Sequence, residues 1–123
     1  MPNISDVFII NTKGTLDRRK IKYCVCVSAL TGTFFYINTE HRDIYDDFEI
    51  KSSDYEFLNS TNRFVSCIKL HSFDSVIIIE QVGNLNRDDM LKIRNKIQRS
   101  KDINKIDKES VLPEIMKWLL GVR

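Results

Sequence analysis

The chain has 123 residues, of which 42% are hydrophobic and 29% charged, a composition typical of one soluble globular domain. This composition excludes collagen-like and disordered chains, and the length leaves little room for a second domain. Basic and acidic side chains nearly balance, 19 against 17, so net charge alone predicts neither a nucleic-acid nor a membrane partner. The basic excess lies in the second half of the sequence.

The N-terminal residues and the cysteines bear on the compartment. The first ten residues lack the basic region and the long apolar run of a signal peptide. The longest strongly apolar stretch, 76–79, is far shorter than the roughly 20 residues that span a bilayer. Three cysteines cannot all pair within one chain. We therefore expect a cytoplasmic protein with reduced thiols and no membrane-spanning segment.

Short apolar or aromatic runs, separated by polar turns, fill the first half of the chain. They predict strands at 7–10, 23–28, 34–39 and 48–51. The turn between the second and third of these strands is short, which favours an antiparallel hairpin.

The second half begins with strands and ends with helices. Strands are expected at 64–70 and 75–82, joined by a loop at 71–74. A first helix follows an N-cap at Asn86, and a last helix is capped by Ser110 and closed by Gly121. The inward faces of these two helices are expected to be Met90, Ile93 and Ile97, and Leu112, Ile115 and Leu119.

This order of elements predicts an α+β fold, mainly β. We expect a small, strongly curved antiparallel sheet or barrel that carries one or two C-terminal helices. One domain covers 1–123, with the barrel at about 4–83 and the helical part at about 86–121. Parallel α/β folds are disfavoured because the strand connections are shorter than a helical crossover needs.

Common cofactor and metal motifs are absent. The sequence has no glycine-rich phosphate loop, no nucleophile elbow and no His-Glu-x-x-His motif. Cys24 and Cys26 face the same side of a predicted strand, but a zinc site would need Cys67 or His41 to converge on them. We expect all three cysteines to be buried, inert and metal-free, and we expect no cofactor.

Basic and polar side chains flank one rim of the predicted hairpin. A basic run that includes Arg18, Arg19 and Lys22 precedes its first strand, and residues 38–42 follow its second. Antiparallel pairing would place Lys22 beside Thr39. Fixed cations and hydrogen-bond donors stabilise negative charge on a phosphodiester, and a histidine such as His41 exchanges a proton near neutral pH. The same residues also fit a solvated surface loop and a structural histidine.

Several short motifs occur in a recognisable order. They are an aliphatic opening strand at 5–10, a basic residue leading into an apolar strand that closes with Ser at 22–28, and a strand ending in Thr at 36–39. A strand at 65–68 and a glycine-containing helix entry at 82–86 follow. Over about residues 4–100 this pattern resembles the PemK/MazF-like family of toxin endoribonucleases. Lys22-Tyr23 stands where the family has an Arg-Pro pair.

The resemblance implies an SH3-like barrel and a metal-independent endoribonuclease that cuts single-stranded RNA. The ribose 2′-OH would attack the adjacent phosphorus, with Lys22 and Thr39 at the catalytic positions and His41 as candidate acid–base group. Arg18, Arg19 and Arg42 are candidate substrate contacts, and could compensate for Lys22 in place of arginine. The family also implies a homodimer and an antitoxin protein as partner.

A second hypothesis belongs to another functional class. The chain could be a catalytically silent barrel that binds nucleic acid or protein, which the Lys22-Tyr23 pair and the near-neutral charge also fit. Tyr23, Tyr45 and Phe73 are candidates to stack on RNA bases, or else belong to the core.

Overall fold

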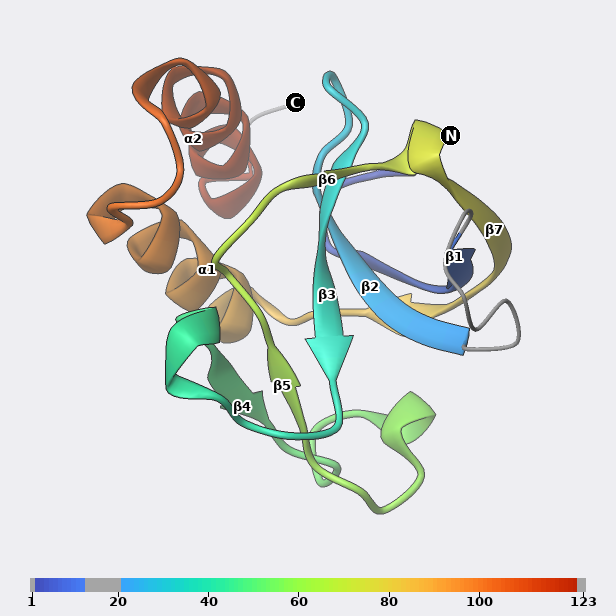
Figure 1. Ribbon diagram of the computed structural model, residues 1–123. Coiled ribbons are helices and arrows are strands. Elements are labelled where there is room, and N and C mark those ends of the chain that lie inside the picture. The colour runs from blue at the N-terminus through green and yellow to red at the C-terminus, as the bar shows by residue number, and fades with distance from the viewer. Residues whose placement is uncertain (1, 13–20, 122–123) are drawn as a thin grey trace.

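The structure is a computed structural model that describes residues 2–12 and 21–121. In these residues seven strands precede two α-helices (Figure 1). The strands are β1 (Asp6–Thr12), β2 (Ile21–Ser28), β3 (Thr33–Asn38), β4 (Phe48–Ile50), β5 (Arg63–Val65), β6 (His71–Ser72) and β7 (Val76–Asn84). The helices are α1 (Arg87–Arg99) and α2 (Lys105–Leu119), and three 3-10 turns are η1 (Asp43–Tyr45), η2 (Glu56–Leu58) and η3 (Phe73–Ser75).

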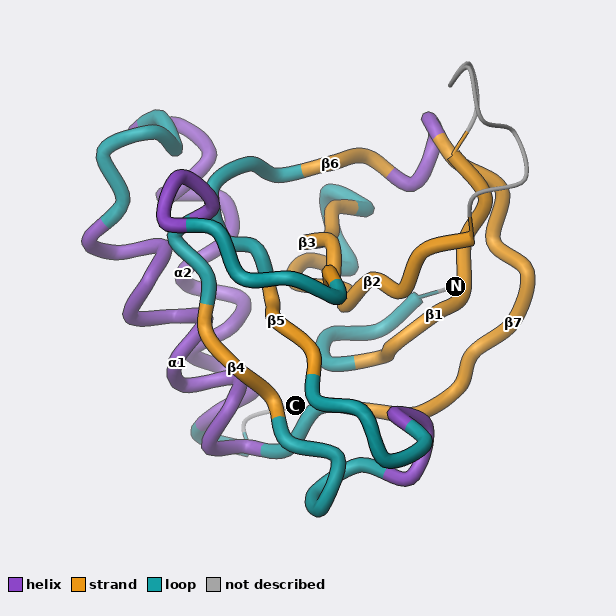
Figure 2. Tube along the Cα trace, turned by 60° about the horizontal axis from the view of Figure 1, so that its bottom comes forward, coloured by secondary structure: helices purple, strands orange, loops and turns teal. Residues whose placement is uncertain are grey.

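The strands form one curved antiparallel sheet in the order β4-β5-β3-β2-β1-β7, with β6 paired to the start of β3. The two helices pack together beside this sheet (Figures 1 and 2). The predicted α+β, mainly β class is confirmed. Within the described residues the sheet is open, because its end strands β4 and β7 do not pair with each other.

The predicted hairpin is present, whereas the strand predicted at 64–70 is much shorter in the structure, where β5 covers Arg63–Val65. β2 and β3 pair antiparallel, with Tyr23 opposite Ile37. β5 ends at Val65: the Ser66 N–H still donates to the Tyr36 carbonyl of β3 at 2.9 Å, but the Cys67 N–H leaves the sheet and donates to the Tyr45 carbonyl at 3.1 Å. The short strand β6 then lies inside the segment 71–74 that was predicted to be a loop.

Strand β2 is buried on both faces and separates two apolar clusters. Val25 and Val27 face the main core, which the helices complete. Cys24 and Cys26 face a smaller cluster with Phe8, Ile10, Phe34 and Val76. The expectation that Cys24 and Cys26 share one buried face is therefore confirmed, as the two-residue period of a strand requires.

Helix α1 forms as predicted. The Asn86 side chain caps it by accepting the Asp89 N–H at 2.8 Å, and Met90, Ile93 and Ile97 are fully buried. No described helix is both long enough and apolar enough to cross a membrane.

Helix α2 begins earlier than the sequence predicted. Asn104, and not Ser110, is its N-cap, with its side chain accepting the Asp107 N–H at 2.8 Å. Ser110 instead donates to the Ile106 carbonyl within the helix. The buried stripe is consequently Val111, Ile115 and Leu119, with Leu112 only half-buried.

A carboxylate joins α2 to the turn between β2 and β3. Glu114 accepts hydrogen bonds from the Ser28 hydroxyl at 2.6 Å and from the Ala29 amide at 2.7 Å. The Leu30 amide donates to the same carboxylate at 3.1 Å. The C-terminal helix thus folds back onto the sheet of its own chain.

A close approach between β7 and η2 occupies the space beside the open end of the sheet. A Cβ atom at Gly83 would lie 2.7 Å from the ring of Phe57. That ring also packs edge-on against Tyr23, with centroids 5.9 Å apart, and lies 5.4 Å from the ring of Tyr55. It therefore cannot shift without disturbing both tyrosines.

We expect Gly83→Ala to lower the free energy of unfolding by about 1–3 kcal/mol, the usual cost of overpacking. Urea denaturation measures this change. The matched control is the same Gly83→Ala substitution made in a Phe57→Ala protein, because removal of the ring removes the clash. An equal loss in both backgrounds would contradict the role of the Phe57 contact.

Candidate functional site

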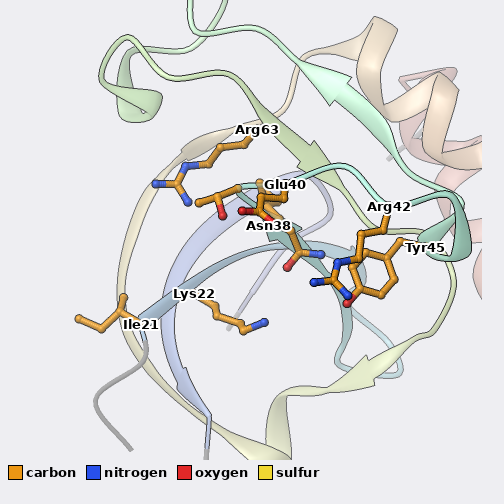
Figure 3. Close-up of a pocket in the computed structure, with 9 residues that line it drawn as sticks. Ile21, Lys22, Asn38, Glu40, Arg42, Tyr45 and Arg63 are labelled. Atoms are coloured by element: carbon orange, nitrogen blue, oxygen red, sulfur yellow. The ribbon is translucent and has the colours of Figure 1, made fainter. Parts of the chain in front are cut away.

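A surface pocket lies where β2, β3 and β5 meet (Figure 3). Its free volume is about 180 Å³, below the roughly 300–1,000 Å³ of typical small-molecule pockets. It is open to solvent and suits a small group such as a phosphate with part of its sugar. The lining residues are Ile21, Lys22, Ile37, Asn38, Thr39, Glu40, Arg42, Tyr45 and Arg63.

Strand register creates this pocket. The β2–β3 pairing that sets Tyr23 opposite Ile37 brings Lys22 to the end of β3. The β3–β5 pairing sets Asn38 opposite Phe64, which brings Arg63 to the same rim. Lys22 and Thr39, which the sequence predicted to lie side by side, both line this pocket.

The pocket carries a positive charge, since Lys22, Arg42 and Arg63 outnumber its one carboxylate, Glu40. Within the described residues, no ion pair includes the side chain of Glu40, Arg42 or Arg63. The two guanidinium groups are therefore not neutralised by a protein carboxylate, and their fork of N–H donors matches a phosphate group.

Aromatic rings support all three cations. The Lys22 ammonium lies 4.7 Å from the ring centroid of Tyr36. The guanidinium of Arg42 lies 5.9 Å from Tyr45, and that of Arg63 lies 4.6 Å from Tyr23. A cation over an aromatic face is attracted by the ring quadrupole, so these contacts orient the cations without consuming hydrogen-bond donors.

His41 lies next to the pocket in sequence but is not among its lining residues. Its Nδ1 is hydrogen-bonded to Asp47, and its Nε2 to Asp43 at 2.9 Å. These two bonds, that of Asp47 first, raise the pKa of His41 above its ordinary value. An imidazolium held by two carboxylates in this way has both nitrogens occupied. Its acid–base role stays a prediction.

The other predicted site residues have different outcomes. Arg18 and Arg19 lie outside the described residues. Arg42 and the stacking candidate Tyr45 both line the pocket. Phe73 belongs to an aromatic cluster instead, with its ring 4.6 Å from that of Phe34.

The sequence reasoning missed Arg63 as a pocket residue, and it placed Asn38 and Glu40 at the rim without giving them a role. Arg63 is the first residue of β5 and lies far from Lys22 along the chain. Only the β3–β5 pairing reveals its position, and no local motif marks it. Asn38 and Glu40 flank Thr39, so their position follows from that of Thr39 once the hairpin register is fixed.

The cysteines lie away from the pocket as free thiols. Burial raises the pKa of Cys24 and of Cys26 to about 12, and raises that of Cys67 as well. At neutral pH they are therefore protonated and poorly nucleophilic. Among residues 2–12 and 21–121, no group of three or more His, Cys, Asp or Glu side chains is arranged to hold a metal ion.

Comparisons with known proteins give no match, either to a protein-family model or to a curated sequence. The assignment of this pocket therefore rests on its own geometry and charge.

The pKa values of the two histidines are expected to be shifted in opposite directions from the ordinary value. His41 should have a pKa above 6.5, and Asp47→Asn should bring it back toward that value. His71, which is stacked on Phe34 and partly buried, has its pKa lowered to about 4, by burial first and then by Lys69 and Lys22. NMR titration of the two imidazole rings measures both values.

The two histidines also change the pH dependence of stability in opposite directions. The stabilisation from His41 is complete below about pH 6.5 and is lost as pH rises through its raised pKa. The effect of His71 is the reverse: stability is lost as pH falls from about 6.5 toward 4, because the unfolded chain takes up the proton first. Equal pKa values for the two rings would contradict these environments.

Proposed function

We propose that this protein is a metal-independent endoribonuclease that binds single-stranded RNA at the rim pocket and cleaves it. The observation that carries this proposal is the group of three cations, Lys22, Arg42 and Arg63, around Thr39 in an open pocket. The resemblance to PemK/MazF-like toxins supports the same positions, Lys22 and Thr39, from the sequence.

The proposed reaction is attack of a ribose 2′-OH on the adjacent phosphorus. The bond from phosphorus to the 5′-oxygen breaks, and a cyclic phosphate and a 5′-hydroxyl are formed. Negative charge grows on the phosphate oxygens, and Lys22 and Arg42 stabilise it. Thr39 positions the phosphate by a hydrogen bond. Glu40 is the pocket carboxylate that can accept the 2′-OH proton, and a proton from His41, the other acid–base candidate, or from water passes to the departing 5′-oxygen.

Single-stranded RNA suits this pocket better than a duplex. Splayed bases can stack on an aromatic ring at the rim, and the half-buried Tyr45 lines the pocket under the guanidinium of Arg42. The pocket is open to solvent, so the remainder of the strand would lie along the protein surface. The family resemblance adds a cytoplasmic setting and an antitoxin protein that blocks the site.

A catalytically silent RNA-binding module is the second candidate. The placement of His41 favours it, because both imidazole nitrogens are engaged by Asp47 and Asp43 outside the pocket. Such a protein would use the same cations for phosphate binding without proton transfer.

Cleavage of single-stranded RNA in excess EDTA tests the proposal. We expect Lys22→Met to lower the cleavage rate by about 100-fold or more, since a donor to the developing charge is lost. Lys22→Arg should retain activity, because arginine grips phosphate bidentately. Lys101→Met, at an exposed lysine outside the pocket, is the matched control.

Binding measured by fluorescence anisotropy separates the two candidates. RNA that is bound but never cut, with affinity lost in Lys22→Met, would support the binding module. His41→Asn, assayed for cleavage, tests the acid–base candidate directly. RNA that is neither bound nor cut would contradict both functions.

We also propose that two copies pair through β7, which forms an edge of the sheet. Three consecutive isoleucines of this strand are exposed: Ile77 by 53%, Ile78 by 39% and Ile79 by 51%. Long apolar edge strands with open backbone groups favour pairing with another strand. Antiparallel pairing of β7 with itself about Ile78 would be symmetric and would cover this row.

Light scattering coupled to size exclusion measures the oligomeric state. We expect a dimer, and we expect Ile78→Lys to shift it to a monomer because the charge would be buried in the interface. Leu30→Lys is the control and should stay dimeric, because Leu30 is an exposed leucine in the turn between β2 and β3, away from β7. A monomeric wild-type protein would contradict the pairing.

A further inference from the structure

Arg63 is held in place by a chain of aromatic contacts. Its guanidinium lies 4.6 Å from the ring centroid of Tyr23. Tyr23 packs edge-on against Phe57, and its hydroxyl donates to the Phe57 carbonyl at 3.5 Å. Phe57 is in turn packed against Gly83 of β7. The orientation of Arg63 is therefore set by the core rather than by a carboxylate.

The same side chain has a buried donor without a partner. Within the described residues, Arg63 Nε is the one buried side-chain nitrogen or oxygen that lacks a hydrogen bond. Buried polar groups are nearly always satisfied, and an unsatisfied donor on a charged group is costly. Because Arg63 also lines the pocket, a small shift of its side chain would turn this donor toward an acceptor that arrives with a ligand.

Arg63 is separated from the second guanidinium of the pocket. Figure 3 shows Arg63 and Arg42 at opposite ends, with Glu40 and Asn38 between them, and the Lys22 ammonium nearer to Arg42. The cations thus form two groups along the pocket rather than one cluster. An RNA strand carries one negative charge on each phosphate along its backbone, so neighbouring phosphates can meet separate cations.

We propose that Arg63 binds a second phosphate of the RNA, next to the phosphate held by Lys22 and Arg42. The recognition unit is then a nucleotide with phosphates on both sides. This inference rests on the proposed RNA substrate and adds a residue to its binding site. The guanidinium fork, with Nε as one donor, grips this phosphate bidentately, and Tyr23 keeps the fork in plane.

The test uses thymidine dinucleotides, which lack the 2′-OH and cannot be cleaved by the proposed reaction. We compare the dinucleotide with one internal phosphate against the same dinucleotide carrying an added terminal phosphate, at either the 5′ or the 3′ end. In the wild-type protein, one of the two additions should raise affinity about tenfold, as a charge-assisted pair does. In Arg63→Ala this gain should vanish, so that the dinucleotide with the favoured terminal phosphate binds no more tightly than the unmodified one.

Three further variants sharpen the result. Arg63→Lys keeps the charge but has no fork, so most of the gain should be lost. Arg42→Ala should weaken binding of every dinucleotide, and Lys51→Ala, at an exposed lysine outside the pocket, should change nothing. In the wild-type protein, the Nε–H NMR signal of Arg63 should move on addition of the dinucleotide with the favoured terminal phosphate. This signal tests the contact without any substitution.

An unchanged gain in folded Arg63→Ala, or an Nε–H signal that does not move, would overturn the role of Arg63. The outcome is independent of cleavage. If the protein cleaves RNA but gains no affinity from a terminal phosphate, the proposed nuclease activity stands and the second phosphate site at Arg63 is rejected. An Arg63-dependent gain in a protein that cuts no RNA would keep the phosphate site and reject the nuclease.

Discussion

The burial of β2 on both faces is the constraint on which the site depends. Cys24, Val25, Cys26 and Val27 are all fully buried, in alternation between two apolar clusters. A slip of one residue would exchange the two faces and place each side chain in the wrong cluster. The register of β2 is therefore fixed by packing on both sides. Because Lys22 precedes this buried run by two residues, its place at the rim is fixed too.

Within the described residues, the two arginines of the rim are held by aromatic rings rather than by carboxylates, and Lys22 also lies over a ring. Tyr36, Tyr45 and Tyr23 lie under Lys22, Arg42 and Arg63. A salt bridge would have engaged the N–H donors that a phosphate requires, whereas a ring engages the face of the cation. Glu40 is the carboxylate that lines the pocket, and the three nearby aspartates are engaged elsewhere. Asp47 and Asp43 bind His41, and Asp46 pairs with Lys96 of α1 at 2.9 Å.

The helices contribute indirectly, by closing the main core and by holding the loops that shape the pocket. Tyr55 donates a hydrogen bond to Asp89 in the first turn of α1, and its hydroxyl accepts the Asn86 amide at 3.0 Å. This network fixes the segment that carries Phe57, and Phe57 supports Tyr23 beneath Arg63. Packing against α1 thus helps to orient Arg63 at the rim, through the contacting side chains of Tyr55, Phe57 and Tyr23.

The sequence by itself determined the mainly β class, the β2–β3 hairpin, the shared face of Cys24 and Cys26, and the approach of Lys22 to Thr39. Each follows from a local period or from a short connection, which are readable without tertiary contacts. Only the tertiary structure decided that the sheet stays open, that β5 ends at Val65, and that Arg63 joins the pocket. It also decided that His41 is held between two aspartates. These outcomes depend on pairing between strands distant in sequence and on which side chains meet after folding, and no local pattern encodes either.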